Sequence, residues 1–219
     1  MKRGMNMKIL ISGFEPFGKM SINPTEDLLK EAEKFAIDKV EITTILLPVN
    51  YDECAEKLIA KLDEINPDIV ISCGLAAGRT SITPERIGIN IKDTGSGDPY
   101  PDNRGNVPVD EIIDENGPDG LFSTLPIRQI EKNLKAEHIP SAISNTAGTF
   151  ICNNTLYAVL NHIRKNNLAI KAGFIHFPAS TEMSARNHSL PSLPQELMAN
   201  ALKVIVETCA REAVLARSK

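Results

Sequence analysis

The amino-acid sequence predicts an α/β fold, an open, mostly parallel, twisted sheet with helices on both faces. Short apolar runs rich in β-branched residues alternate along the first part of the chain with longer segments that have a helical apolar stripe. The apolar runs show little polar alternation, which is typical of parallel strands covered on both faces. Residues that commonly cap helices stand between several of these segments.

The first third of the chain follows a strand, helix, strand, helix, strand order. We expect strands at residues 8–13, 40–47 and 68–74. The first helix is opened by Asn23 as N-cap and Pro24 at the first helical position, and the second by residues 50–53. Two apolar stripes support the helices: Leu28, Leu29, Ala32, Phe35 and Ala36 in the first, and Cys54, Leu58, Ile59, Leu62 and Ile65 in the second.

The remaining chain continues the pattern with two long polar interruptions. Residues 85–92 alternate strictly, with Ile87, Ile89 and Ile91 on one side, and predict a half-exposed strand that could run antiparallel to the others. Further elements are expected as helices at 126–138 and 150–166, strands at 140–145 and 170–177, and a long final helix opened by a capping box at 192–195. The loops 93–108 and 179–191 are candidates for lids or subunit contacts.

Composition narrows the class of protein. With 219 residues, 42% hydrophobic and 24% charged, the chain suits one domain over 1–219, with residues 1–6 as a flexible extension. A net charge of −4 without a basic run argues against a nucleic-acid partner. No apolar stretch has the length of a membrane span or of a signal-peptide core, so a cytoplasmic protein is expected. No cluster has metal-ligand spacing, and neither a metal nor a cofactor is predicted.

The four cysteines lack CxxC spacing and are expected to be free thiols. Cys54 and Cys209 fall on apolar helical stripes, where a buried small side chain is the simpler interpretation. Cys73 lies near the end of a predicted parallel strand and is a rival nucleophile. Cys152 lies at the start of a predicted helix, where the dipole and free N–H groups stabilise a thiolate. From this position alone, a reactive thiol and a filler residue are equally good interpretations.

A nucleophilic thiol needs a base and an orienting acid. His176 lies at the end of a predicted strand, at the sheet edge where such sites occur, although a hydrogen-bonded core histidine is the alternative. Glu85 is in phase with the isoleucine row that follows it. If that row is buried, the carboxylate requires a cationic or hydrogen-bonding partner, which could be a strand-end arginine or an imidazolium. Glu85, His176 and Cys152 together have the residue types of a catalytic relay.

Several sequence blocks resemble the pyrrolidone-carboxylate peptidase family, also called pyroglutamyl peptidase type I. The similarity runs in order from about residue 7 to the C-terminal helix. The blocks are GFEPFG (13–18), INP (22–24), GLAAGR with ITPERIGIN (74–90), PDNRGNVPVDE (101–111), SNTAGTFICN (144–153) and GFIHFP (173–178). The resemblance implies an open α/β sandwich similar to the purine nucleoside phosphorylase-like fold, a cytoplasmic homotetramer, and a triad of Cys152, His176 and Glu85.

The resemblance also implies a reaction, the removal of N-terminal pyroglutamate from peptides through a thioester. The Cys152 N–H and Arg79 are the expected oxyanion donors, with an ion pair to Glu85 or another acid as the alternative role of Arg79. Phe14 and Phe17 are expected to sandwich the flat ring, unless both are core residues. Asn23 is a possible substrate contact beside its capping role. Some relatives carry Gln at the position of Leu75, so ring recognition here would rely more on backbone groups.

Two other functions remain open at this stage. A nucleoside or nucleobase phosphorylase on a similar sheet would require phosphate and no cysteine. A small-ligand binding protein would keep the fold without catalysis, and thiol reagents would not affect its binding. Release of a chromophore from a pyroglutamyl anilide without phosphate distinguishes the peptidase from both.

Overall fold

The computed structural model describes residues 6–95 and 100–217. Most of the predicted extension at 1–6 therefore lies outside the described residues. The strands are β1 (Met7–Phe14), β2 (Val40–Leu47), β3 (Ile69–Leu75), β4 (Thr83–Pro84), β5 (Ile87–Ile89), β6 (Gly120–Phe122), β7 (Lys171–Phe177), β8 (Ala179–Ser180) and β9 (Ser192–Leu193). The helices are α1 (Pro24–Ala32), α2 (Cys54–Ile65), α3 (Ile127–Ala136), α4 (Ile151–Lys165), α5 (Thr181–Arg186) and α6 (Gln195–Arg217).

The central sheet has the strand order β2-β1-β3-β7-β4, and only β4 runs antiparallel to its neighbour. The chain moves outward from β1 to β2 and then crosses back to β3 on the other side of β1. Strand order therefore reverses at β1 and β3, and a crevice forms at their carboxyl ends, where open α/β sheets bind ligands. The predicted mostly parallel α/β class is confirmed, with antiparallel β4 at the edge.

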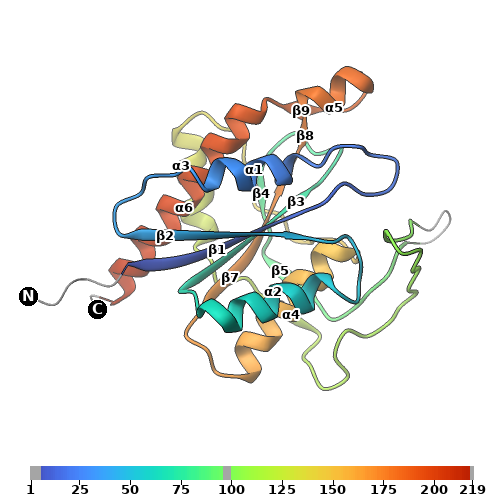
Figure 1. Ribbon diagram of the computed structural model, residues 1–219, viewed down its shortest axis with the longest axis horizontal. Coiled ribbons are helices and arrows are strands. Elements are labelled where there is room, and N and C mark those ends of the chain that lie inside the picture. The colour runs from blue at the N-terminus through green and yellow to red at the C-terminus, as the bar shows by residue number, and fades with distance from the viewer. Residues whose placement is uncertain (1–5, 96–99, 218–219) are drawn as a thin grey trace, which may run out of the picture.

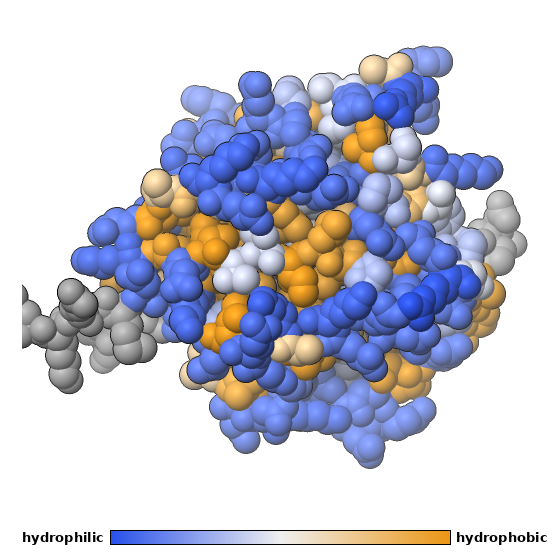
Figure 2. All heavy atoms as spheres, in the orientation of Figure 1, coloured by the Kyte–Doolittle hydropathy of each residue, from blue (hydrophilic) through white to orange (hydrophobic). Residues whose placement is uncertain are grey.

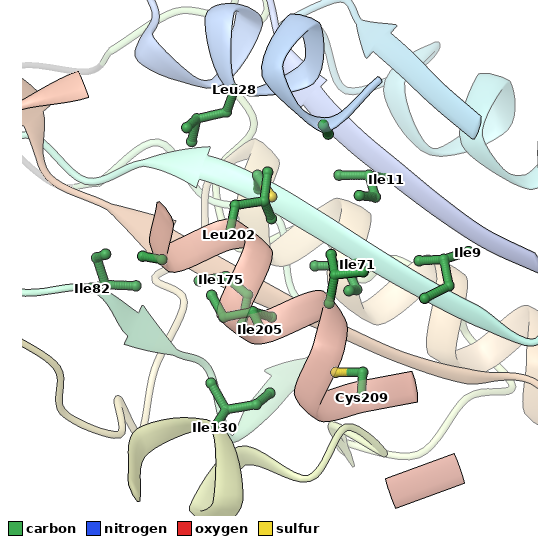
Figure 3. Packing of buried hydrophobic residues seen from close by; sticks show 14 of the residues in the cluster. Ile9, Ile11, Leu28, Ile71, Ile82, Ile130, Ile175, Leu202, Ile205 and Cys209 are labelled. Atoms are coloured by element: carbon green, nitrogen blue, oxygen red, sulfur yellow. The ribbon is translucent and has the colours of Figure 1, made fainter. Parts of the chain in front are cut away.

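Helices cover both faces of the sheet, with α1, α3 and α6 on one side and α2 and α4 on the other (Figure 1). Successive side chains of β1 point to opposite faces of the sheet, so Ile9 and Ile11 pack in one core and Leu10 in the other. Both faces are therefore apolar and must be covered by helices. In the first core, Leu202 and Ile205 of α6 pack with strand residues such as Ile71 (Figure 3). All of these side chains are fully buried, which explains the continuous apolar strands of the sequence.

The β2 edge of the sheet faces outward between the two helical layers. Figure 2 shows hydrophobic residues between the hydrophilic surfaces of α1 and α2, where Figure 1 draws β2. Most β2 side chains are half-buried, and Leu46 is 44% exposed. No helix in the described ranges is long and apolar enough to cross a membrane.

Two predicted helix boundaries are wrong for local reasons. Helix α1 ends at Ala32, and Phe35 and Ala36 lie beyond it, because the chain must turn back to begin β2 at Val40. The capping box predicted at 192–195 does not form. Ser192 belongs to β9 and donates its hydroxyl proton to Ser184 Oγ, while α6 begins at Gln195.

Three predicted extended or loop segments also differ from the structure. In residues 85–92 only β5 is a regular strand, and Gly88 and Asn90 are buried while the three isoleucines are half-buried. Gly88 packs closely against α4, since a Cβ at this position would lie only 3.0 Å from the Tyr157 backbone nitrogen. Residues 140–145 form only isolated bridges, at Ser141 and Ser144. The loop predicted at 179–191 contains β8 and α5.

Candidate active site

The carboxyl ends of β1 and β3 and the first turn of α4 enclose a small apolar cavity. Phe14 ends β1, Leu75 ends β3, and Cys152 is the second residue of α4. The remaining lining residues come from the loops between elements: Phe17, Asn23, Val49, Phe150 and Ile151. The cavity therefore brings together four residues predicted for the site, namely Phe14, Phe17, Asn23 and Cys152.

The start of α4 leaves its backbone donors available around Cys152. Phe150 is the N-cap residue and provides no side-chain hydrogen bond, and the first turn carries no acidic residue. Gly148, with φ +78°, makes the turn that leads into the helix. The N–H of Cys152 lies in the first turn, where it has no partner within the helix. An oxyanion or a thiolate placed here would be stabilised by this N–H and by the helix dipole.

The alternation of side chains along β7 puts His176 on the same face of the sheet as Cys152. Phe174, two residues earlier, packs in the core beneath α2 and α4. Gly74 pairs with His176 in the β3–β7 register, and a Cβ on Gly74 would lie 3.0 Å from Cys152 Sγ. Cys73, the rival thiol, is fully buried in the opposite core under α1 and α6.

Glu85 directly follows strand β4, whose pairing with β7 places the Glu85 carboxylate beside the imidazole of His176. Thr83 pairs with His176, and the N–H of Glu85 donates to the carbonyl of Phe174 over 2.9 Å. Glu85 is fully buried, and its Oε1 lies 2.7 Å from His176 Nδ1. The burial of the isoleucine row was the condition of the sequence argument, and the three isoleucines are only half-buried. Pairing of the chain with β7 buries the carboxylate instead.

Arg79 is the second partner of the buried carboxylate. Its Nη1 donates to Glu85 Oε1 over 2.6 Å and also to the Thr83 hydroxyl, while Nη2 donates to the carbonyl of Thr146 over 3.2 Å. Arg79 therefore forms an ion pair with Glu85, which is the alternative role that the sequence analysis gave it. Glu85 Oε1 thus accepts from both a ring nitrogen and a guanidinium, whereas Oε2 has no hydrogen-bond partner among the described residues.

Burial and these contacts set the protonation states. Burial by itself would raise the pKa of Glu85, but the hydrogen bond and charge of His176, together with the Arg79 contact, lower it below its ordinary value. Burial lowers the pKa of His176 despite the opposing effect of Glu85. The resting site therefore holds a carboxylate and a neutral imidazole.

The thiol of Cys152 is also neutral at rest. Burial raises its pKa to about 12, with the electrostatic influence of Cys54 and Glu85 adding to the effect and that of Arg79 opposing it. Among the described residues, no hydrogen bond joins Cys152 to His176, so a proton can pass between the two groups only if they draw closer together. Cys152 is nevertheless the only half-buried thiol, since Cys54, Cys73 and Cys209 are buried.

Aromatic rings close the cavity, whose volume is about 20 Å³. The ring centroid of Phe17 lies 6.0 Å from that of Tyr100 and 6.2 Å from that of Phe150. A space of this size suits about one water molecule, not a five-membered lactam. Phe14 is anchored in the core, and Asn23 uses its side chain to cap α1 and to donate to the Glu15 carbonyl. Opening therefore depends on Phe17, Tyr100 and Phe150.

Comparisons with known proteins identify the chain's relatives. The family profile described as pyroglutamyl peptidase matches residues 7–212. The chain belongs to the pyroglutamyl peptidase family. It is 46% identical over 202 residues to a pyrrolidone-carboxylate peptidase of Brachyspira hyodysenteriae, covering 92% of this chain and 98% of that protein. The crystal structure of pyroglutamyl peptidase I from Bacillus amyloliquefaciens is 37% identical with a TM-score of 0.89, covering 94% of this chain and 96% of that one.

A second solved structure supports the same assignment. A variant pyrrolidone carboxyl peptidase from Pyrococcus furiosus is 38% identical to this chain, with a TM-score of 0.90 and coverage of 94% and 100%. The resemblance seen in the sequence blocks, and the enzyme class of cysteine-type exopeptidase that it implied, are confirmed. Membership of the pyroglutamyl peptidase family also favours this class over the phosphorylase and the binding protein.

Sequence reasoning did not single out four residues that the structure places at the candidate site: Gly74, Thr83, Tyr100 and Phe150. Phe150 stands two residues before Cys152 in the same block and could have been found there. Tyr100 could not, because its contacts reach across the fold. The other histidines lie elsewhere, with His162 bonded to Asp63. No group of three or more potential metal ligands occurs among the described residues.

Proposed function

We propose that this protein hydrolyses the bond after an N-terminal pyroglutamyl residue, with Cys152 as nucleophile, His176 as general base and acid, and Glu85 as the orienting carboxylate. The observation that carries the proposal is the buried hydrogen bond between Glu85 Oε1 and His176 Nδ1, on the sheet face that also holds Cys152. Family membership supports the substrate, since relatives are named for it.

The hydrogen bond supports a definite imidazole tautomer. When Nδ1 donates its proton to Glu85, the lone pair of Nε2 is free to accept a proton from the thiol. The raised pKa of Cys152 and the lowered pKa of His176 favour a neutral pair over a preformed thiolate–imidazolium pair. His176 therefore takes the thiol proton as the sulfur attacks the pyroglutamyl carbonyl.

The rest of the cycle follows from the same groups. The tetrahedral oxyanion accepts a hydrogen bond from the N–H of Cys152, and collapse breaks the C–N bond as His176 protonates the leaving amine. Water then attacks the thioester, His176 accepts its proton, and the C–S bond breaks to regenerate the thiol. The imidazolium formed in each half is stabilised by the carboxylate of Glu85.

Arg79 acts in this proposal by holding the carboxylate. Its contacts to Glu85, Thr83 and the Thr146 carbonyl support this role over direct oxyanion binding. Its charge also opposes the rise in the pKa of Cys152. Phe14 and Phe17 are the proposed walls of the lactam pocket, which opens when the aromatic cover moves. The homotetramer and the cytoplasmic location stay predictions from the resemblance.

The test is turnover of pyroglutamyl-p-nitroanilide in phosphate-free buffer, before and after thiol alkylation. We expect chromophore release that alkylation abolishes. Cys152→Ser should have no measurable turnover while its unfolding midpoint stays near that of the parent protein. Turnover that survives both treatments would refute the nucleophile, and absence of turnover in the untreated protein would refute the substrate.

A further inference from the structure

A second cavity lies beside the Cys152 cavity and has no role in the chemistry described so far. Its volume is about 370 Å³, far more than the 20 Å³ around the thiol. Its walls are largely apolar, formed by Met20, Ile22, Met183 and Leu190, with Lys19 and Arg186 at its polar side. The segments that build it are the loop after β1, the turn after β3, and the α5 region.

The two cavities share a wall. Phe17 and Leu75 line the Cys152 cavity, and both also pack in the apolar cluster that contains Met183 and Leu190. The covalent chain sets an upper limit on the distance between the two cavities. Gly74 approaches Cys152 Sγ, and Ala77 lines the larger cavity. Gly74 and Ala77 are three peptide units apart, which is at most about 11 Å. The residue after the scissile bond begins about one peptide unit, ~3.8 Å, from the carbonyl, and its side chain extends further toward the larger cavity.

We infer that the larger cavity is the leaving-group subsite, which binds an apolar side chain of the residue following pyroglutamate. Lys19 at its edge then favours substrates that end soon after that residue in a free carboxylate. This inference rests on the proposed function, because the cavity has meaning as a subsite only if Cys152 attacks a pyroglutamyl carbonyl.

The charges around the cavity support a carboxylate partner. Arg186 is already engaged, with Nη1 donating to Ser21 Oγ over 2.7 Å and Nη2 pairing with Glu182 over 3.1 Å. The bond to Ser21 ties α5 to the loop after β1, whereas the pair with Glu182 lies within α5. Lys19 is exposed and makes no ion pair with any described residue, so it is the cation available to a ligand. An exposed charge of this kind changes affinity by a few-fold.

The apolar preference is tested with substrates that differ only after pyroglutamate: pyroglutamamide, pyroglutamyl-alanine and pyroglutamyl-leucine. We expect the parent protein to prefer the leucine over the alanine dipeptide in kcat/KM by about tenfold or more. Leu190→Trp, which fills the cavity, should reduce that ratio to near one. A leucine preference that is absent from the parent protein, or unchanged in Leu190→Trp, would overturn the subsite.

The carboxylate preference is tested with pyroglutamyl-leucine and its amide. Lys19→Glu should lower the acid-to-amide ratio of kcat/KM several-fold, whereas Lys203→Glu, a matched change on an exposed lysine of α6, should leave it unchanged. Equal ratios in all three proteins would overturn the role of Lys19.

If pyroglutamamide and both dipeptides resist hydrolysis by the parent protein, the proposed function fails and the inference with it. Hydrolysis without a preference for the leucine side chain refutes the subsite but leaves the proposed function standing.

Discussion

Replacement of Glu85 by glutamine separates the charge of the proposed triad from its geometry. Glu85 Oε1 accepts from both His176 Nδ1, at 2.7 Å, and Arg79 Nη1, at 2.6 Å. A glutamine oxygen at the same place can accept both bonds, so the imidazole keeps its tautomer. What disappears is the negative charge beside the imidazolium that forms in the proposed mechanism.

The magnitude follows from burial and distance. Opposite charges 2.7 Å apart attract by about 6 kcal/mol at an effective dielectric constant of 20, which is an upper value because Arg79 is 30% exposed and reorganises. Removal of one partner of a buried pair costs about 3–5 kcal/mol. At about 1.4 kcal/mol per tenfold, kcat for Glu85→Gln should fall roughly 10²- to 10⁴-fold.

The assay is kcat for pyroglutamyl-p-nitroanilide, compared with His176→Ala and with thermal unfolding. The glutamine amide would occupy the position of Oε2, which has no partner, and should destabilise the fold by about 1–3 kcal/mol without unfolding it. The loss in kcat should remain smaller than that of His176→Ala. A kcat within threefold of the parent protein, or a loss equal to that of His176→Ala, would refute the assignment of Glu85 as an orienting charge.

Three further predictions address the thiol and its neighbours. Gly74→Ala places a Cβ 2.7 Å from the Phe174 ring and 3.0 Å from Cys152 Sγ, so kcat/KM should fall at least tenfold, and unchanged kinetics would contradict this packing. The proposed base is the neutral form of His176, and burial lowers the pKa of this histidine below its ordinary value of 6.5. The acid limb of kcat/KM should therefore have its midpoint below pH 6.5, and a midpoint above 7 would disagree. Iodoacetamide should modify Cys152 first, faster as pH rises, and mass spectrometry showing Cys73 modified first would contradict the exposures.

The parallel core was predictable from sequence because its signal is local. Strand β3, predicted at 68–74, is found at Ile69–Leu75 and is fully buried, and a strand buried between layers reads as a continuous apolar run. The start of α1 was predictable for a similar reason, because the Asn23 side chain accepts from the Thr25 N–H two residues away. Short strands such as β4 and β6 depend on partners far along the chain and leave no such local pattern.

The site was predictable in its residue types but less so in its contacts. Glu85 was expected to be a buried carboxylate with a cationic or hydrogen-bonding partner, and it has two, although pairing with β7 buries it and the isoleucine row does not. Cys73 and Cys152 were rivals because both lie near strand or helix ends. Only the alternation of β3 in the folded sheet assigns Cys73 to the opposite core. The cover formed by Tyr100 depends on a contact with Phe17 across more than eighty residues of sequence.

The small cavity and the raised pKa of the thiol have one physical cause, the restricted access of water to the half-buried Cys152. A desolvated thiol at rest is a poor nucleophile, and a cavity of about 20 Å³ admits no lactam ring. Substrate entry must part the aromatic cover, and the same event brings a carbonyl to the uncapped N–H groups of α4. Under the proposed mechanism, the imidazolium–carboxylate pair then forms only as sulfur bonds to carbon. Reactivity would thus depend on the bound substrate, and a small ring analogue should change the alkylation rate of Cys152 while leaving the three buried thiols unaffected.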